Sequence, residues 1–141
     1  DAWAALAHSY LLSDDLARAY DAYQQALYRV ADPRDPQLWF GIGVLYHRYG
    51  SWAHAEEALR AVLAIDGAFA RAPEVHYRLG LIYKHQRKLR SAVTHLRRVL
   101  TYAPHTHSRG QLWFQIGHAY ELAGDARAAR RCYERVLTLI G

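Results

Sequence analysis

Hydrophobic and polar positions along this chain repeat with a period longer than any single helix. An aromatic residue or His is followed three residues later by Leu or Ile, then at once by a small residue, and after three more by Tyr. This motif begins at Trp3, Trp39, His76 and Trp113, so that successive copies start 36, 37 and 37 residues apart. The pattern predicts tandem copies of one supersecondary unit rather than a domain with one unique core.

A second pattern follows within each copy and predicts an antiparallel helix pair. The small residues Ala19, Ala55, Ala92 and Ala129 each precede a Tyr or Leu by four positions, which is a helical spacing. Gly43 and Gly80, in the first half of their copies, allow close approach of a neighbouring helix. Turn signals stand between the halves at 13–15, 50–51 and 124–125, where Gly, Ser and Asp supply C-terminal stops or N-caps. We expect first helices at 1–13, 36–49, 73–87 and 110–123, and second helices at 15–30, 52–65, 89–102 and 126–140.

These spacings resemble the tetratricopeptide-repeat (TPR) consensus over essentially the whole chain. The resemblance implies an all-α, right-handed superhelical solenoid of four helix-turn-helix units, at about 1–35, 36–72, 73–109 and 110–141. The pattern starts and stops inside helices, so we expect a single array that is a fragment of a longer one. Its period exceeds the usual one of about 34 residues. The surplus falls in the connectors 32–36, 66–73 and 103–110, which we interpret either as decoration or as an edge contact with a partner.

Composition is that of an ordinary soluble globular protein, with 52% hydrophobic and 22% charged residues. No apolar run approaches the roughly 18 residues of a membrane span. The single cysteine, Cys132, stands at a buried-type position of the last helix, so it is expected to be an inert buried thiol.

The net charge of +5 raises the question of nucleic-acid binding. Arg127, Arg131 and Arg135 form a stripe on the last helix, but no DNA- or RNA-binding motif accompanies them. We interpret them as a solvated face, with weak electrostatic contact to an acidic partner or DNA as the alternative. Direct sequence-specific nucleic-acid binding is not expected.

Candidate chemistry for catalysis or metal binding is sparse. The acidic pairs Asp14-Asp15 and Glu56-Glu57 are sequence neighbours, whose side chains diverge by about 100° on a helix. Only His105 and His107 lie close together in an expected loop, too few for a zinc site of about four ligands. We therefore expect no enzyme activity, no metal and no cofactor.

The first helices provide the surface on which we expect partner binding. In a right-handed stack of such hairpins, two positions of each first helix face a concave groove. They are the residue directly after the aromatic or His that starts each copy, and the residue five positions after that same aromatic or His. The next helical turn adds a third row. An amphipathic helix or extended peptide with apolar anchors and some acidic residues would suit this groove. The aromatic members have a second interpretation, which is packing between layers. The predicted groove set is Phe40, Val44, His47, Arg48, Tyr77, Leu81, Lys84, His85, Phe114 and His118.

The groove set also separates this chain from one class of TPR protein. Co-chaperone TPR domains hold the C-terminal carboxylates of heat-shock chaperones with a Lys/Asn/Arg clamp. This chain contains no asparagine, and positions of the clamp rows hold Phe40, Val44, Tyr77 and Leu81. A receptor for chaperone tails is therefore disfavoured.

A closer resemblance appears when whole segments are compared. Segments 14–28 (DDLARAYDAYQQALY), 38–51 (LWFGIGVLYHRYGS), 55–58 (AEEA) and 77–86 (YRLGLIYKHQ) resemble the TPR region of the fungal general transcriptional corepressor, the Ssn/Cyc-type glucose-repression mediator. The generic repeat does not demand QQALY or YKHQ, so this likeness is specific. The Arg- and Ala-rich segment 126–131 departs from it, which leaves the outer face the least transferable part.

The resemblance implies a non-catalytic nuclear scaffold. Its partners would be the Tup-type WD-repeat corepressor, sequence-specific DNA-binding repressors and other chromatin regulators. Two alternatives stay open, a TPR adaptor of another assembly and the TPR module of a UTX-like histone demethylase, which shares a GIGVLY-like stretch.

Overall fold

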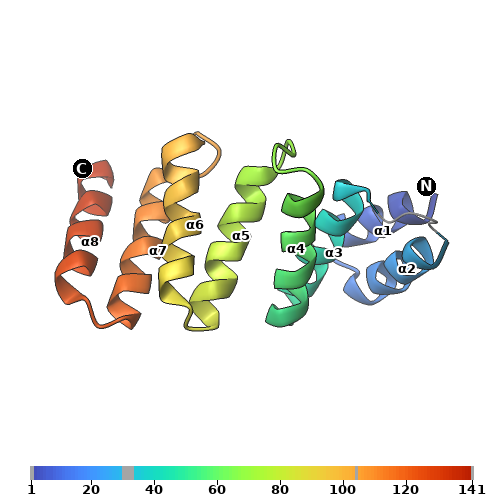
Figure 1. Cartoon of the computed structure of the whole chain (residues 1–141), viewed down its shortest axis with the longest axis horizontal. Helices are drawn as coiled ribbons and strands as arrows, with labels where there is room; N and C mark the ends of the chain where they lie inside the picture. The colour runs from blue at the N-terminus through green and yellow to red at the C-terminus, as the bar shows by residue number, and fades with distance from the viewer. Residues whose placement is uncertain (1, 30–33, 104, 141) are drawn as a thin grey trace. The chain divides into compact units, whose positions relative to one another are not determined.

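The described residues of the chain form eight α-helices arranged as four successive hairpins (Figure 1). The computed structural model describes residues 2–29, 34–103 and 105–140, and this part of the chain contains no strand. Asp32, Pro33 and Pro104 of the predicted connectors lie outside the described residues. Each helix lies within about two residues of its predicted limits, so the all-α fold class is confirmed. The helices are α1 (Ala2–Leu12), α2 (Leu16–Arg29), α3 (Pro36–Tyr49), α4 (Trp52–Ile65), α5 (Ala72–His85), α6 (Leu89–Tyr102), α7 (Arg109–Leu122) and α8 (Ala126–Ile140).

Contacts divide the chain into two compact units of two hairpins each. Residues 1–69 form the N-terminal half, with α1 to α4, and residues 70–141 form the C-terminal half, with α5 to α8. In each half the first hairpin packs against the second, through α3 in one and through α6 and α7 in the other. Each half therefore has a core of its own.

The turn inside each hairpin places one residue in the left-handed region of backbone space. Gly50 and Gly124 adopt φ of 77° and 84° there, as the turn signals predict. Asp14 and Arg87 stand at the equivalent position of the other two hairpins, each with φ of 63°. A side chain costs energy in this conformation, which glycine avoids. The turn geometry is thus common to all four hairpins, although only two have the favourable residue.

Helix N-caps follow the sequence at some positions and not at others. The Asp35 and Asp125 carboxylates accept hydrogen bonds from the backbone N–H groups of Gln37 and Ala128, both at 3.0 Å. Ser51 occupies the N-cap position of α4, as the turn signal predicts, but its side chain does not cap the helix. Its hydroxyl lies 2.8 Å from Nδ1 of His54, so the side chain is bonded to the imidazole and makes no cap hydrogen bond.

Small residues bring the two helices of a hairpin together, as predicted. A Cβ atom on Gly43 would lie 2.6 Å from Leu59, and one on Gly80 would lie 2.7 Å from Leu96. Both leucines are fully buried. Because Leu59 and Leu96 hold the same place in their units, the two halves share one packing rule.

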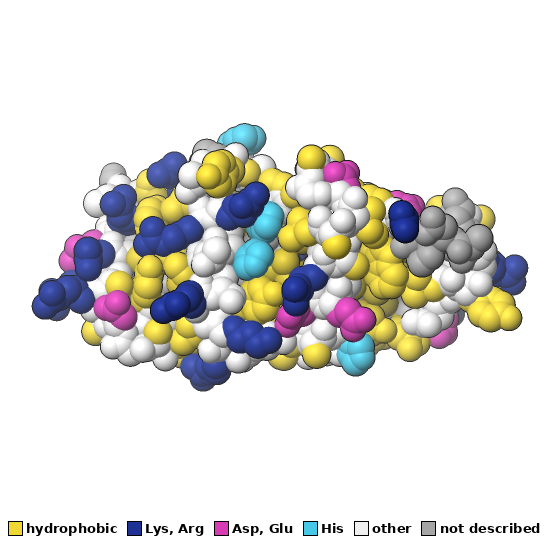
Figure 2. Space-filling model, viewed as in Figure 1, with side chains coloured by type: hydrophobic (Ala, Val, Ile, Leu, Met, Phe, Trp, Pro, Cys, Tyr) yellow, Lys and Arg dark blue, Asp and Glu magenta, His cyan; other side chains and the backbone are white. Residues whose placement is uncertain are grey.

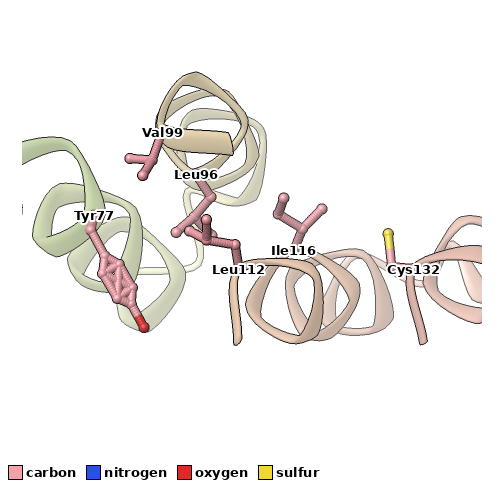
Figure 3. Packing of buried hydrophobic residues seen from close by; sticks show 6 residues of the cluster. All are labelled: Tyr77, Leu96, Val99, Leu112, Ile116 and Cys132. Atoms are coloured by element: carbon pink, nitrogen blue, oxygen red, sulfur yellow. The ribbon is translucent and has the colours of Figure 1, made fainter. Parts of the chain in front are cut away.

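The core of the C-terminal half runs from α5 to α8 (Figure 3). Leu96 of α6 meets Leu112 of α7 at its centre, while Ile116 and Cys132 continue it towards α8. Cys132 is 4% exposed, so the expected buried thiol is confirmed, and burial raises its pKa.

Candidate protein-binding surface

In the N-terminal half, the apolar members of the groove set lie in the interior. Phe40 is 4% exposed and Val44 is 6% exposed. The Phe40 ring packs on Phe69, with ring centroids 5.8 Å apart. Phe69 belongs to the connector after α4, where its N–H bonds to the Asp66 carbonyl at 3.1 Å. These two positions consequently offer a partner little surface.

The polar members of this half connect its hairpins. Arg48 Nη1 donates to the Leu11 carbonyl at 2.8 Å and lies 3.6 Å from the Asp14 carboxylate. His47 is half-buried and packs edge-on against Trp52. Arg48 therefore ties the second hairpin to the turn of the first.

The corresponding aromatic of the C-terminal half is covered in a similar way. Tyr77 is 8% exposed, and the ring of His107 lies 4.5 Å from its own, centroid to centroid. His107 Nε2 is also 3.0 Å from the Glu74 carboxylate, which accepts a hydrogen bond from Arg78 at 2.8 Å. Burial alone would raise the pKa of Glu74, but the charge of Arg78 and the bonds from Arg78 and His107 outweigh it and lower that pKa.

The long connectors thus have a structural role that the sequence did not reveal. The connectors after α4 and α6 each turn tightly, with Phe69 N–H bonded to Asp66 and Thr106 N–H bonded to the Ala103 carbonyl at 3.2 Å. The first connector then places the Phe69 ring against Phe40, and the second places the His107 ring against Tyr77. The residues that lengthen these two connectors beyond the usual repeat thus cover Phe40 and Tyr77 of the groove set.

Other members of the groove set in the C-terminal half are more accessible. Lys84 donates to Nδ1 of His118 at 3.0 Å and to the side-chain carbonyl of Gln115, which joins α5 to α7. Partial burial lowers the pKa of Lys84. Leu81 is half-buried, while His85 is exposed. This cluster combines an amine, imidazoles and apolar surface.

Phe114 is the exposed aromatic of the groove set. Its side chain is 49% exposed, although the ring contacts His118 and Tyr133 at centroid distances of 6.4 and 5.8 Å. Tyr133 in turn donates to the Glu121 carboxylate at 2.6 Å. Phe114 is consequently the aromatic of the set that a partner could contact directly.

The remaining candidate chemistry is not assembled into a site. Among the described residues, no three His, Cys, Asp or Glu side chains are placed to hold a metal ion. His105 and His107 do not converge with a third ligand, because His107 faces Glu74 and Tyr77. No described helix has the length and apolar character needed to cross a membrane.

With the hairpins in place, comparison with known proteins identifies their class. Tetratricopeptide-repeat family models match residues 2–37, 73–106 and 110–140. The chain therefore belongs to the tetratricopeptide-repeat family, as its spacing predicted.

Named relatives show which proteins part of this chain is similar to. The chain is 57% identical over 75 residues to the general transcriptional corepressor trfA of Dictyostelium discoideum, and 57% identical over 74 residues to the general transcriptional corepressor ssn6 of Schizosaccharomyces pombe. These matches cover 53% and 52% of this chain but only 5% and 7% of those proteins. The corepressor CYC8 of Saccharomyces cerevisiae is 50% identical over 52 residues. The predicted likeness to general transcriptional corepressors is confirmed.

Solved structures support the fold. MamA superposes with a TM-score of 0.80 at 18% identity, covering 96% of this chain and 70% of MamA. BtubC from P. vanneervenii superposes with a TM-score of 0.79 at 20% identity, and the match covers 96% of this chain and 61% of the BtubC chain. At these identities the likeness is one of fold alone.

Proposed function

We propose that this chain is a protein–protein interaction scaffold of a transcriptional corepressor complex, without catalytic activity and acting in the nucleus. The observation that carries the proposal is the 57% identity to two general transcriptional corepressors. A repeat array suits such a role because it offers extended surface on a framework of local contacts.

The proposed partners are the Tup-type WD-repeat corepressor and DNA-bound repressors, recruited through side chains of the groove set. Phe114 would act as an apolar anchor, because its exposed ring lies 6.4 Å from that of His118, which is bonded to the Lys84 amine. Leu81 stands one helical turn before Lys84 on α5 and would add apolar surface. An amphipathic helix with a large apolar side chain and nearby carboxylates complements this chemistry. Phe40 and Tyr77 would support the surface from below, since both are buried.

Calorimetric titration with the N-terminal helical region of a Tup-type corepressor tests this proposal. Phe114→Ala should weaken binding at least about tenfold, as expected for an interface hot spot. The matched control is Tyr102→Ala, which removes an aromatic ring that is 77% exposed at the end of α6. This control should leave affinity within about twofold, because Tyr102 lies outside the groove set.

Two results would count against the proposal. Absence of binding by the folded unsubstituted chain would exclude this partner for residues 1–141. Equal loss in Phe114→Ala and Tyr102→Ala would show that the groove set is not the contact surface.

A further inference from the structure

A cleft on the C-terminal half lies away from the groove set, between α6 and α8, with α7 as its floor. One part has a volume of about 540 Å³ and apolar walls that include Leu89, Val93 and Ala119. The adjoining part, of about 390 Å³, is lined by Trp113, Arg131 and Arg135 among others. Arg97, Tyr120 and Asp125 border both parts, so the two are continuous. We call this feature the outer cleft.

The outer cleft is strongly basic. Arg90, Arg97, Arg131 and Arg135 line it, against a single lining carboxylate among the described residues, Asp125, which is engaged in capping α8. In the part of the chain that the structure describes, no carboxylate lies within ion-pair distance of Arg97, Arg131 or Arg135. Figure 2 shows Lys and Arg side chains alternating with apolar atoms over the region of α6 and α8. The positive charge of these three arginines is thus not neutralised by a described carboxylate.

Two aromatic rings hold guanidinium groups at the cleft. Arg135 lies over the Trp113 ring, 4.7 Å from its centroid, and Arg97 lies 6.0 Å from the centroid of Tyr120. Arg97 Nη2 also donates to the Tyr120 hydroxyl at 3.2 Å. Such stacking orients a guanidinium while leaving other N–H groups available to a carboxylate.

The N-terminal half shows that the fold does not require these arginines. When the third unit is aligned with the first and the fourth with the second, Gln24 stands at the position of Arg97. Glu57 and Ala61 stand at the positions of Arg131 and Arg135. The same aromatic pair, as Trp39 and Tyr46, stands at the positions of Trp113 and Tyr120. Hairpins of the same repeat pattern therefore form with neutral or acidic residues at these outer positions.

Side-chain size differs between the halves as well as charge. At the positions of Val93 and Ala128, the N-terminal half has Tyr20 and His54. Both rings pack on Tyr46, with centroid distances of 6.4 and 5.1 Å. The smaller Val93 and Ala128 leave the corresponding space over Tyr120 open, and both residues line the cleft.

From this geometry we infer that the outer cleft is a second docking site, which binds an acidic protein segment carrying an apolar anchor. Aspartate or glutamate side chains of the segment pair with Arg97, Arg131 and Arg135, while a Leu or Phe enters the apolar part beside Val93. This site is separate from the groove set and does not depend on the partner proposed for it.

A protein segment fits the cleft better than a nucleic acid does. A phosphate backbone would pair with the arginines but would leave the apolar walls around Val93 and Ala119 uncovered. Nucleic-acid contacts are dominated by phosphate pairing along a positive surface, whereas here apolar and basic surface alternate within one cavity.

Fluorescence anisotropy with a short labelled peptide, rich in Asp and Glu around one Leu and one Phe, tests the site on the 141-residue chain. The variant Arg131→Glu/Arg135→Ala gives α8 the residues that α4 carries at those positions. It should weaken binding at least about tenfold, because charge-assisted contacts to carboxylates are lost. The matched control, Arg127→Ala/Arg130→Glu, also transfers α4 residues and changes the charge equally, but at exposed positions outside the cleft. It should alter affinity by no more than about twofold, as screened surface charges do.

A second variant tests the apolar part. Val93→Tyr/Ala128→His copies the ring pair that covers Tyr46 in the N-terminal half, so it is compatible with the hairpin fold. This variant should also weaken peptide binding, while its circular dichroism spectrum and melting temperature remain close to those of the unsubstituted chain.

Three results would overturn the inference. The first is absence of peptide binding by the unsubstituted chain. The second is equal weakening by the cleft and control arginine pairs, which would mean that only net charge matters. The third is displacement of the peptide by duplex DNA that itself requires Arg131 and Arg135, which would assign the cleft to nucleic acid.

Discussion

The two halves of this chain share a backbone plan and differ in their surfaces. Both bring paired helices together through a glycine against a buried leucine, Gly43 on Leu59 and Gly80 on Leu96. Their charges are opposite, because residues 1–69 hold five basic and nine acidic side chains, a net charge of −4, and residues 70–141 hold thirteen and four, a net charge of +9. The interior contacts define the repeat, whereas the outward positions differ between the halves.

The largest contrast predicted between the halves concerns aromatic rings in equivalent places. Phe40→Ala should destabilise the chain by about 3–5 kcal/mol, because the ring is buried against Phe69. Phe114→Ala should cost less than about 1 kcal/mol, because half of that side chain is exposed. Urea denaturation of both variants measures the difference. Equal costs would contradict the covering role assigned to the connector.

The shared packing rule predicts equal effects in the two halves. Gly43→Leu and Gly80→Leu should each destabilise by at least about 2 kcal/mol, since the new side chain would collide with Leu59 or Leu96. Thermal unfolding followed by circular dichroism checks both. If one variant were tolerated while the other unfolded, the halves would not share one packing rule.

Acid should weaken the C-terminal half through a histidine pair. Nδ1 of His76 lies 2.9 Å from Nδ1 of His95, so one ring donates and the other accepts through an unprotonated Nδ1. Burial, followed by the charges of His95 and Arg98, lowers the pKa of His76 to about 4. In the unfolded chain this pKa returns to about 6.5. The unfolded state then binds more protons, and stability is lost as pH falls from about 6.5 to about 4.

The melting temperature measured between pH 7 and pH 4 tests this account, with His76→Trp as the informative variant. Trp occupies this position in the other three units, as Trp3, Trp39 and Trp113. The substitution should reduce the acid-induced loss, although His8, whose pKa is lowered mainly by burial, contributes to it too. An unchanged pH dependence in His76→Trp would remove the pair as a cause.

The smallest predicted effect is at the hairpin turn. Arg87→Gly should stabilise the chain by up to about 1 kcal/mol, because a left-handed φ of 63° costs Arg more than Gly. Asp14→Gly should stabilise the chain less, because Asp tolerates a left-handed φ better than Arg does. The substitution would also remove the ion pair of Asp14 with Arg48, whose atoms lie 3.6 Å apart. Melting temperatures compared with the unsubstituted chain would show the order, and destabilisation by Arg87→Gly would contradict it.

Periodicity predicted the fold well because repeats impose the same residue type at the same place four times. Helix limits, the Gly80 contact and burial of Cys132 all follow from such positions. The covering rings could not be predicted in this way, because Phe69 and His107 lie in connectors that carry no helical period. The bond between Ser51 and His54 was missed for a similar reason, since a local side-chain partner competed with the cap.

The candidate site was harder to predict than the fold. The groove set stays a prediction, because its members differ in accessibility for a reason outside the helices: connector rings cover Phe40 and Tyr77, whereas Phe114 is exposed. The outer cleft had a signal in the sequence. It lies in the contrast of Val93 and Ala128 with the larger Tyr20 and His54, visible once the units are aligned position by position.

We propose that partner binding takes place on the C-terminal half of the chain, where Phe114 is exposed. Hydrogen–deuterium exchange of the chain, alone and saturated with the helical region of a Tup-type corepressor, tests it most directly. The account predicts added protection in α5 and α7, where Leu81, Lys84, Phe114 and His118 lie. Protection confined to α1–α4 under saturating conditions would contradict it.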